Sequence, residues 1–295
     1  MAARVGEVYD RGYRPYEGPR GGRLAAVAAL YRSTLRRALG FRRTWWHKLM
    51  PWLLLGIVTL PAAVNVGLAY VTRDTVTDPI EIITYRTYVG VSSALLLFVA
   101  LVAPDVLCPD RRQRVLPLIF SRPLKGRDYA LAKLAAITTL LVAFSLLPQM
   151  LLFTGQMLVS RDGALGYFTD HLAVLWQVPV AVLLLSIYYA ALALAVSSLT
   201  SRRIVAAASI LGIVWVTSSV SRVLELADDV SPAVTVFNFL RLPLYARDLV
   251  FLGHIDDDFR LAELSGGGAL ALAAYVAVVG VSLTVLLWRY RWVET

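Results

Sequence analysis

The sequence predicts an all-α membrane protein with six transmembrane helices, and three observations support this prediction. Apolar residues make up 58% of the 295 residues and charged residues only 17%, against about 45–50% and about 25% in soluble globular chains. The mean hydropathy is +0.65. The apolar residues also concentrate in six runs without Asp, Glu, Lys or Arg, each long enough to cross about 30 Å of hydrocarbon as a helix. These runs predict spans at about 49–72, 87–107, 131–155, 174–199, 204–222 and 267–288.

Two elements precede the first span. Residues 1–22 are rich in Arg, Tyr, Gly and Pro and show no helical period, so we expect an irregular N-terminal arm that is either disordered or docked on a partner. Residues 23–46 have a helical period, with Leu24, Tyr31 and Leu35 on one face and arginines beside it. An apolar stripe flanked by Arg and followed by tryptophans predicts an amphipathic helix in the membrane interface.

The remaining segments connect the spans. The link at 109–128 contains a basic cluster and the apolar stretch 115–120, which we expect to bury against the membrane interface or another protein. The few residues around 202–203 predict a tight hairpin of the fourth and fifth spans. The outer segment at 222–263 is predicted to form short helices at the outer leaflet, and 289–295 is a short tail.

The basic residues predict the orientation in the membrane. Because the number of spans is even, both termini lie on the same side. The segments on that side hold 22 of the 29 Lys and Arg residues, and basic residues favour the cytoplasmic side. We therefore expect a multi-pass protein of a bacterial cytoplasmic membrane with both termini in the cytoplasm. The net charge of +9 then follows membrane topology, which argues against a nucleic acid as the partner.

The sequence contains none of the common catalytic or nucleotide-binding motifs. There is no H-E-x-x-H, no G-x-S-x-G and no G-x-x-x-x-G-K-[ST]. The six apolar runs contain no carboxylate and no basic side chain, whereas transporters driven by ion gradients usually place such groups at mid-membrane depth. We therefore expect a chain that is not an enzyme, holds no metal or cofactor, and depends on a separate protein for energy.

The link between the second and third spans resembles that of a known family. Together with the Tyr- and Arg-rich N-terminus and the end at 289–291, it is similar to the permease subunits of ATP-binding cassette (ABC) type-2 exporters, in particular actinobacterial members. In that family a Gly-Thr pair commonly follows the acidic residue, whereas this chain has Arg114-Val115. The matching positions are Asp110, Arg111, Leu118, Ser121, Arg122, Pro123, Leu124, Asp128, Tyr129 and Lys133.

This resemblance implies a transport mechanism. The permease would pair with a second permease subunit, identical or paralogous, and bind two ATPase subunits that carry ATP and Mg²⁺. A short coupling helix within 109–120 would sit in a cleft of the ATPase, and the interfacial helix would lean on the same subunit. The residues expected at the ATPase contact are Asp110, Arg111, Arg112, Val115, Leu116, Leu118, Arg122 and Pro123.

In the family, the second and fifth spans line the substrate path, with the first span nearby. The hydroxyl side chains expected along that path suit an amphiphilic drug or a lipid as substrate; they are Ser92, Ser93, Thr217, Ser218 and Ser219. Two alternatives stay open. One is a non-transporting membrane scaffold or sensor component, and the other is a membrane-embedded enzyme that modifies lipid, against which the missing catalytic cluster argues.

Overall fold

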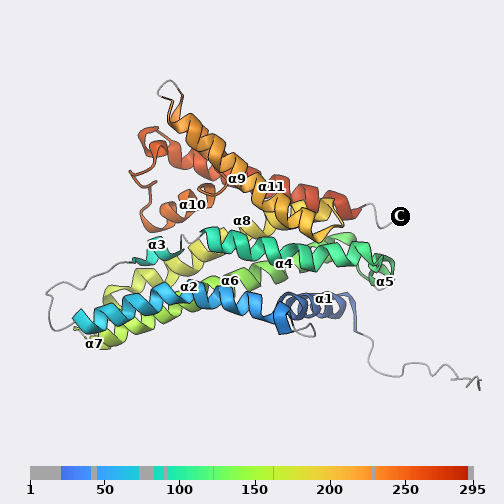
Figure 1. Cartoon of the computed structure of the whole chain (residues 1–295), viewed down its shortest axis with the longest axis horizontal. Coiled ribbons are helices and arrows are strands. Elements are labelled where there is room, and N and C mark those ends of the chain that lie inside the picture. The colour runs from blue at the N-terminus through green and yellow to red at the C-terminus, as the bar shows by residue number, and fades with distance from the viewer. Residues whose placement is uncertain are drawn as a thin grey trace, which may run out of the picture.

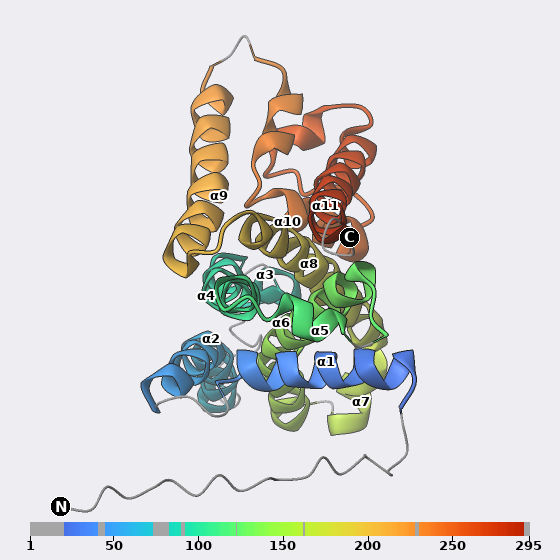
Figure 2. The same cartoon turned by 90° about the vertical axis from the view of Figure 1, so that its right-hand side faces the viewer.

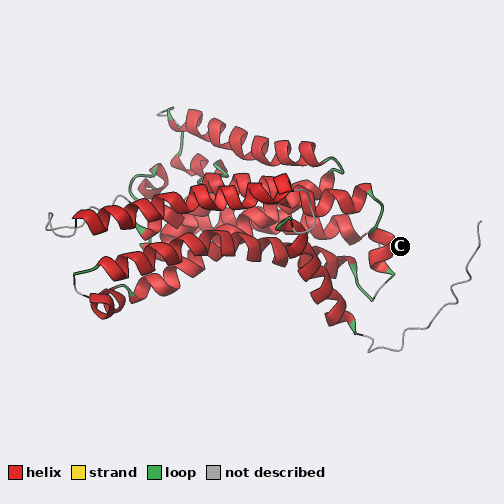
Figure 3. Cartoon of the chain, turned by 60° about the horizontal axis from the view of Figure 1, so that its bottom comes forward, coloured by secondary structure: helices red, strands yellow, loops and turns green. Residues whose placement is uncertain are grey.

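The computed structural model describes residues 21–40, 45–72, 83–89, 92–121, 123–161, 163–227 and 230–291, and most of these residues are helical. Within these residues every regular element is a helix (Figure 3). Six helical segments are long and apolar enough to cross a membrane. The predicted class, an all-α membrane protein with six spans, is confirmed. Most of the predicted N-terminal arm lies outside the described residues, as does the tail beyond Arg291.

The spans lie side by side along the long axis of the molecule (Figure 1). They are formed by α2 (Trp45–Thr72), α3 (Tyr85–Val89) followed by α4 (Ser92–Arg112), α6 (Gly126–Val159), α8 (Leu172–Leu199), α9 (Arg203–Glu225) and α11 (Gly267–Arg291). The shorter helices are α1 (Arg23–Ala38), α5 (Leu116–Phe120), α7 (Gly163–Asp170), η1 (Pro232–Phe237), α10 (Leu242–Phe251) and η2 (Arg260–Glu263). Figure 1 shows α1 and α5 at one end of the bundle and α3, α7 and α10 toward the other.

The helix α8 forms the centre of the bundle. It packs against α4, α6, α9 and α11, and its alanines at 190, 191, 193 and 195 are buried, so neighbouring backbones can approach closely. Two tyrosine hydroxyls connect it to other elements. Tyr188 donates to the Phe239 carbonyl of the outer segment at 3.1 Å, and Tyr275 of α11 donates to the Leu184 carbonyl at 2.8 Å.

The helix α4 extends farther than the sequence predicted. The predicted second span ends at 107, but the helix continues through Pro109 to Arg112. Proline removes a backbone donor and usually bends or ends a helix. Here side-chain contacts on two faces hold the last turns of α4, as described below, so the chain remains helical. Asp110 therefore lies on a packed helix end and not in a loop.

The helices α2 and α6 approach closely at Gly155. A Cβ added to Gly155 would lie 2.4 Å from Cγ2 of Val66. The sequence offers another pattern of small residues, Ala208 and Gly212 in α9, whose four-residue spacing permits close helix contact. A Cβ at Gly212, however, would meet no atom of this chain within 4 Å. The tight contact inside the chain thus lies on α6.

Replacing Gly155 by Ala is expected to destabilise the protein by about 1–3 kcal/mol, because the added methyl group overpacks the α2–α6 contact. Gly212→Ala is the matched control and should leave stability unchanged or slightly increased, because Ala is the better helix former. Thermal unfolding of both variants in detergent measures the difference. An equal loss of stability in the two variants would contradict a specific role for Gly155.

Ion pairs fasten the outer segment to α3. Arg86 of α3 contacts Asp256, and its guanidinium lies 3.6 Å from Oδ1 of Asp248 in α10. Arg247 donates to the same Oδ1 at 2.6 Å and to the Arg86 carbonyl at 3.2 Å. Burial raises the pKa of Asp248 against the opposing effect of the two arginines, whereas the hydrogen bond from Arg86 lowers the pKa of Asp256. Arg86 therefore neutralises two carboxylates at once, one of them fully buried.

The substitution Arg86→Met is expected to cost about 3 kcal/mol, because it leaves the buried Asp248 with a single cation. Asp256→Asn should cost less than about 1 kcal/mol, because that carboxylate is partly solvated. Calorimetric unfolding of the two variants in the same detergent provides the comparison. An equal loss of stability in Asp256→Asn and Arg86→Met would mean that the cost of removing Arg86 comes from its pair with Asp256. That result would contradict a role for Arg86 in neutralising Asp248.

Candidate functional site

The short helix α5 lies beyond the end of α4, where Figure 1 shows it at one extreme of the bundle. Leu116, Ile119 and Phe120 are half-buried and pack on the core of the bundle. Leu118 lies on the opposite side, with 72% of its surface exposed. The apolar stretch predicted from the sequence is thus covered in part by the chain itself, and one large apolar residue remains available for contact with another molecule.

A buried ion pair holds the end of α4 against α6. Asp110 in the last turn of α4 is 3% exposed, and Lys133 of α6 is 2% exposed. The Nζ of Lys133 donates to Oδ2 of Asp110 at 2.8 Å and to the Val106 carbonyl at 3.2 Å. The Tyr129 hydroxyl donates to the same Oδ2 at 2.8 Å, and Arg37 of α1 pairs with Oδ1. A single carboxylate therefore joins α1, α4 and α6.

The helix α1 lies across the ends of the spans (Figure 2). It is attached to α6 near its start, where Arg23 donates twice to the Asp128 carboxylate at 2.7 and 2.8 Å. The Tyr31 hydroxyl donates to Oγ1 of Thr139 at 3.0 Å. The helix ends at Ala38, so the interfacial helix predicted for 23–46 is shorter than expected. Residues 41–44 lie outside the described part of the chain.

The opposite face of α4 holds the turn between α8 and α9. Arg111 donates to the Ser198 carbonyl and, at 3.4 Å, to the Thr200 carbonyl. These carbonyls lie at the end of α8, where a helix leaves backbone acceptors without internal partners. Asp105 pairs with Arg203 at the start of α9. Asp105 and Arg111 thus connect the end of α4 to the fourth and fifth spans.

A groove of about 510 Å³ separates α1 from α5. Its walls include Leu30 of α1 and Leu118 and Ile119 of α5, while Arg37, Asp110 and Lys133 also line it. The groove is therefore apolar along its sides and polar at the network that joins the three helices. This combination favours a partner that inserts an apolar side chain between α1 and α5.

The residues predicted to contact an ATPase lie in different environments. Asp110 is buried inside the chain, and Arg111 is half-buried and bound to carbonyls of α8, so both act within this molecule. Val115 and Leu116 are half-buried. Arg122 lies outside the described residues. The exposed members of the predicted set are Arg112, Leu118 and Pro123.

The predicted path residues do not form one surface. Ser93 and Ser219 are exposed, whereas Ser218 is 5% exposed and its hydroxyl has no hydrogen-bond partner in this chain. The Thr217 hydroxyl donates to the Ile213 carbonyl at 2.8 Å, within its own helix. Ser92 belongs to α4, and its side chain lies outside the described part. Because α4 packs against α9, the exposed members nevertheless lie on neighbouring helices.

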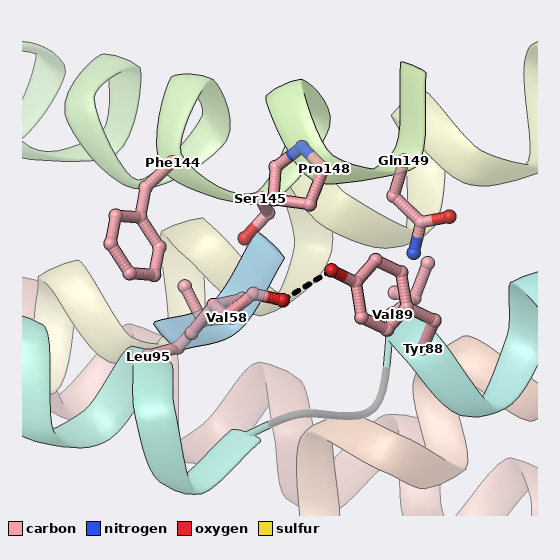
Figure 4. Close-up of a pocket in the computed structure, with 8 residues that line it drawn as sticks. All are labelled: Val58, Tyr88, Val89, Leu95, Phe144, Ser145, Pro148 and Gln149. Carbon is pink, nitrogen blue, oxygen red and sulfur yellow. Dashed lines mark hydrogen bonds between the residues drawn. The ribbon is translucent and has the colours of Figure 1, made fainter. Parts of the chain in front are cut away.

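A small cavity lies between α2, α3, α4 and α6 (Figure 4). Its volume is about 20 Å³, which holds one water molecule and no larger ligand. In Figure 4 the Tyr88 hydroxyl points into this region and donates to the Val58 carbonyl, with Ser145 nearby. Gln149 also lines the cavity, and its Oε1 has no partner in this chain. This cavity is too small to be a substrate path.

Sequence analysis missed the residues that organise the site. Lys133 matches the family pattern, but the sequence does not indicate its pairing with Asp110, and it does not single out Arg37. One signal was available, because Lys133 stands directly before an apolar run of 27 residues, where an unpaired ammonium would be costly. Its partner comes from another helix and could not be identified from spacing alone.

The described residues contain no group of three or more His, Cys, Asp or Glu side chains that could hold a metal ion. A comparison with the known protein families and with the curated proteins finds no match for this chain. The site is therefore interpreted from its own geometry.

Lys133→Met is expected to destabilise the protein by about 3 kcal/mol, because it removes the buried cation that pairs with the buried Asp110 carboxylate and leaves only the partly exposed Arg37. The double variant Lys133→Met with Asp110→Leu should recover most of that loss, since replacing a buried pair by apolar residues is often neutral. Asp128→Asn, which breaks the more exposed pair with Arg23, is the control and should change stability little. A double variant as unstable as Lys133→Met alone would contradict a paired role for the two residues.

Proposed function

We propose that this chain is the membrane-spanning permease subunit of an ATP-driven ABC exporter. The observation that carries the proposal is the attachment of α5. This short apolar helix stands at the end of the bundle, exposes Leu118, and is connected through α4 to α1, α6 and the α8–α9 turn. A force applied to α5 from outside would reach four of the six spans through these contacts.

The energy for transport would come from a separate subunit. The sequence lacks a P-loop and the common catalytic motifs, so ATP and Mg²⁺ would be bound by two ATPase subunits, and this chain would be neither an enzyme nor a cofactor-binding protein. The groove between α1 and α5 would receive part of each ATPase. Closure of the two ATPases around ATP would then displace α5 and the attached spans.

The substrate path would form between two permease subunits, identical or paralogous. Figure 2 shows α2, α4 and α9 on one flank of the bundle, and α2 and α9 are among the spans least buried within the chain. Their exposed apolar side chains, Trp215 of α9 and Ile57 of α2 among them, would face lipid or the second subunit. Ser93 of α4 and Ser219 of α9 are exposed, and a path along these two helices would suit an amphiphilic drug or a lipid.

The proposed location is a bacterial cytoplasmic membrane with both termini in the cytoplasm. It is supported by the basic residues that gather at the end formed by α1, α5 and the end of α11, since basic residues favour the cytoplasmic side. That orientation would present α5 and the α1–α5 groove to a cytoplasmic ATPase.

Purification of the tagged chain from its native membrane tests the proposal. An ATPase subunit should co-purify in stoichiometric amount, and inside-out vesicles should take up a fluorescent phospholipid or a cationic dye only when ATP is present. A stable chain that carries no ATPase, in vesicles that show no ATP-dependent uptake of either probe, would contradict the proposal.

Leu118→Asp is expected to lower ATPase binding and ATP-dependent uptake at least about tenfold, because a carboxylate cannot replace the exposed apolar side chain in an apolar pocket. The thermal stability of the isolated chain should not change, since Leu118 is exposed. Leu226→Asp is the matched control. Leu226 is 85% exposed and directly follows the C-terminal end of α9, which lies far from α5. Equal ATPase binding by wild type and Leu118→Asp would contradict a docking role for α5.

A further inference from the structure

The turn between α4 and α5 contains an arginine in an unfavourable backbone conformation. Arg114 has a φ of 52°, and it is the one non-glycine residue with positive φ in the described part of the chain. This left-handed conformation costs about 1–2 kcal/mol for a residue with a side chain, and Gly or Asn usually occupies such positions after a helix. The Arg114 side chain is nevertheless exposed to solvent, so no buried contact of that side chain explains its presence.

Four exposed basic side chains flank α5 in the sequence. Arg112 and Arg114 precede the helix, Lys125 and Arg127 follow it, and all four are exposed; we call these four residues the basic collar. In the described parts of 21–40 and 110–128 the only carboxylates are Asp110 and Asp128. Each of them is already paired with a cation of this chain. Within these described segments, no further carboxylate is left to neutralise the basic collar.

The position of the basic collar favours a protein as its partner. Figure 1 shows α5 beyond the end of α4, farther along the bundle axis than the spans. The basic collar flanks α5 on both sides in the sequence, and α5 carries the exposed Leu118, which also lines the α1–α5 groove. An exposed apolar side chain on a segment flanked by charges is typical of a protein docking site, in which the apolar side chain supplies affinity and the charges set orientation.

We propose that the basic collar binds an acidic surface of the ATPase subunit, on which carboxylates surround an apolar pocket for Leu118. This inference rests on the proposed function and adds the chemistry of the partner's docking face. Arg114 is held in a strained turn because its charge contributes to this contact. The attraction would accelerate association and fix the register of docking, and it would weaken as salt screens the charges.

Arg114→Gly removes the charge at this position and also relieves the backbone strain. It therefore distinguishes a role of the charge in ATPase binding from a role of the residue in the stability of the chain. Arg114→Lys keeps the charge and the strain, and Arg222→Gln removes an exposed charge at the opposite end of α9. Each variant of the full chain is placed in nanodiscs, and its affinity for the co-purifying ATPase subunit is measured at about 0.05 M and about 0.5 M salt. The melting temperature of each isolated variant is recorded as well.

Arg114→Gly is expected to bind the ATPase about five- to tenfold more weakly at low salt and to differ little from wild type at high salt, while its melting temperature stays equal or rises. Arg114→Lys and Arg222→Gln should bind like wild type. Carbodiimide labelling of the ATPase should show Asp or Glu side chains that the wild-type chain protects and Arg114→Gly protects less.

Three results would overturn the inference. In the first, Arg114→Gly binds the ATPase at low salt as tightly as the wild type does. In the second, the affinity of the wild type does not depend on salt. In the third, the basic collar binds vesicles rich in phosphatidylglycerol, and no ATPase carboxylate is protected from labelling. These results presuppose that the ATPase binds the wild-type chain. If no ATPase binds at all, the proposed function itself fails, so the two failures can be told apart.

Discussion

The Asp110 carboxylate is the point on which the arrangement of the α1–α5 end depends. Its two oxygens accept from Lys133 and Tyr129 on α6 and pair with Arg37 on α1. A carboxylate and an ammonium that are both almost fully buried would be costly if separated. The three helices therefore keep one relative position. Because α5 begins only four residues after the end of α4, the same contacts also fix the position of α5.

The last turns of α4 bind neighbouring elements on two opposite faces. One face carries Asp110 and holds α1 and α6, while the other carries Asp105 and Arg111 and holds the α8–α9 turn. The two prolines in α4 do not end the helix because both faces are fixed in this way. A rigid helix end of this kind would carry a displacement of α5 into most of the bundle, which is what a subunit driven from outside requires.

The sequence was sufficient to predict the class, the six spans and the grouping of basic segments at one end, because hydrophobic length and charge are properties of single segments. It also located the apolar stretch that forms α5. It did not predict that Asp110 is internal, because Lys133 and Arg37 approach it from distant parts of the chain. Nor did it predict the left-handed Arg114, since the family resemblance suggested a Gly-Thr pair near this turn and a residue type alone does not reveal φ.

Rigid attachment of α5 to the spans is tested most directly by a distance measurement in the chain bound to the proposed ATPase subunit. Spin labels would be placed at Ser121, directly after α5, and at Leu131 of α6, which are both exposed, whereas the single native cysteine, Cys108, is buried. If the Asp110 network holds, the distance between the labels stays the same with and without ATP, and its distribution broadens when Asp110 is replaced by Asn. A distance that changes with ATP in the wild-type protein would show that α5 moves independently of α6 and would contradict the rigid connection.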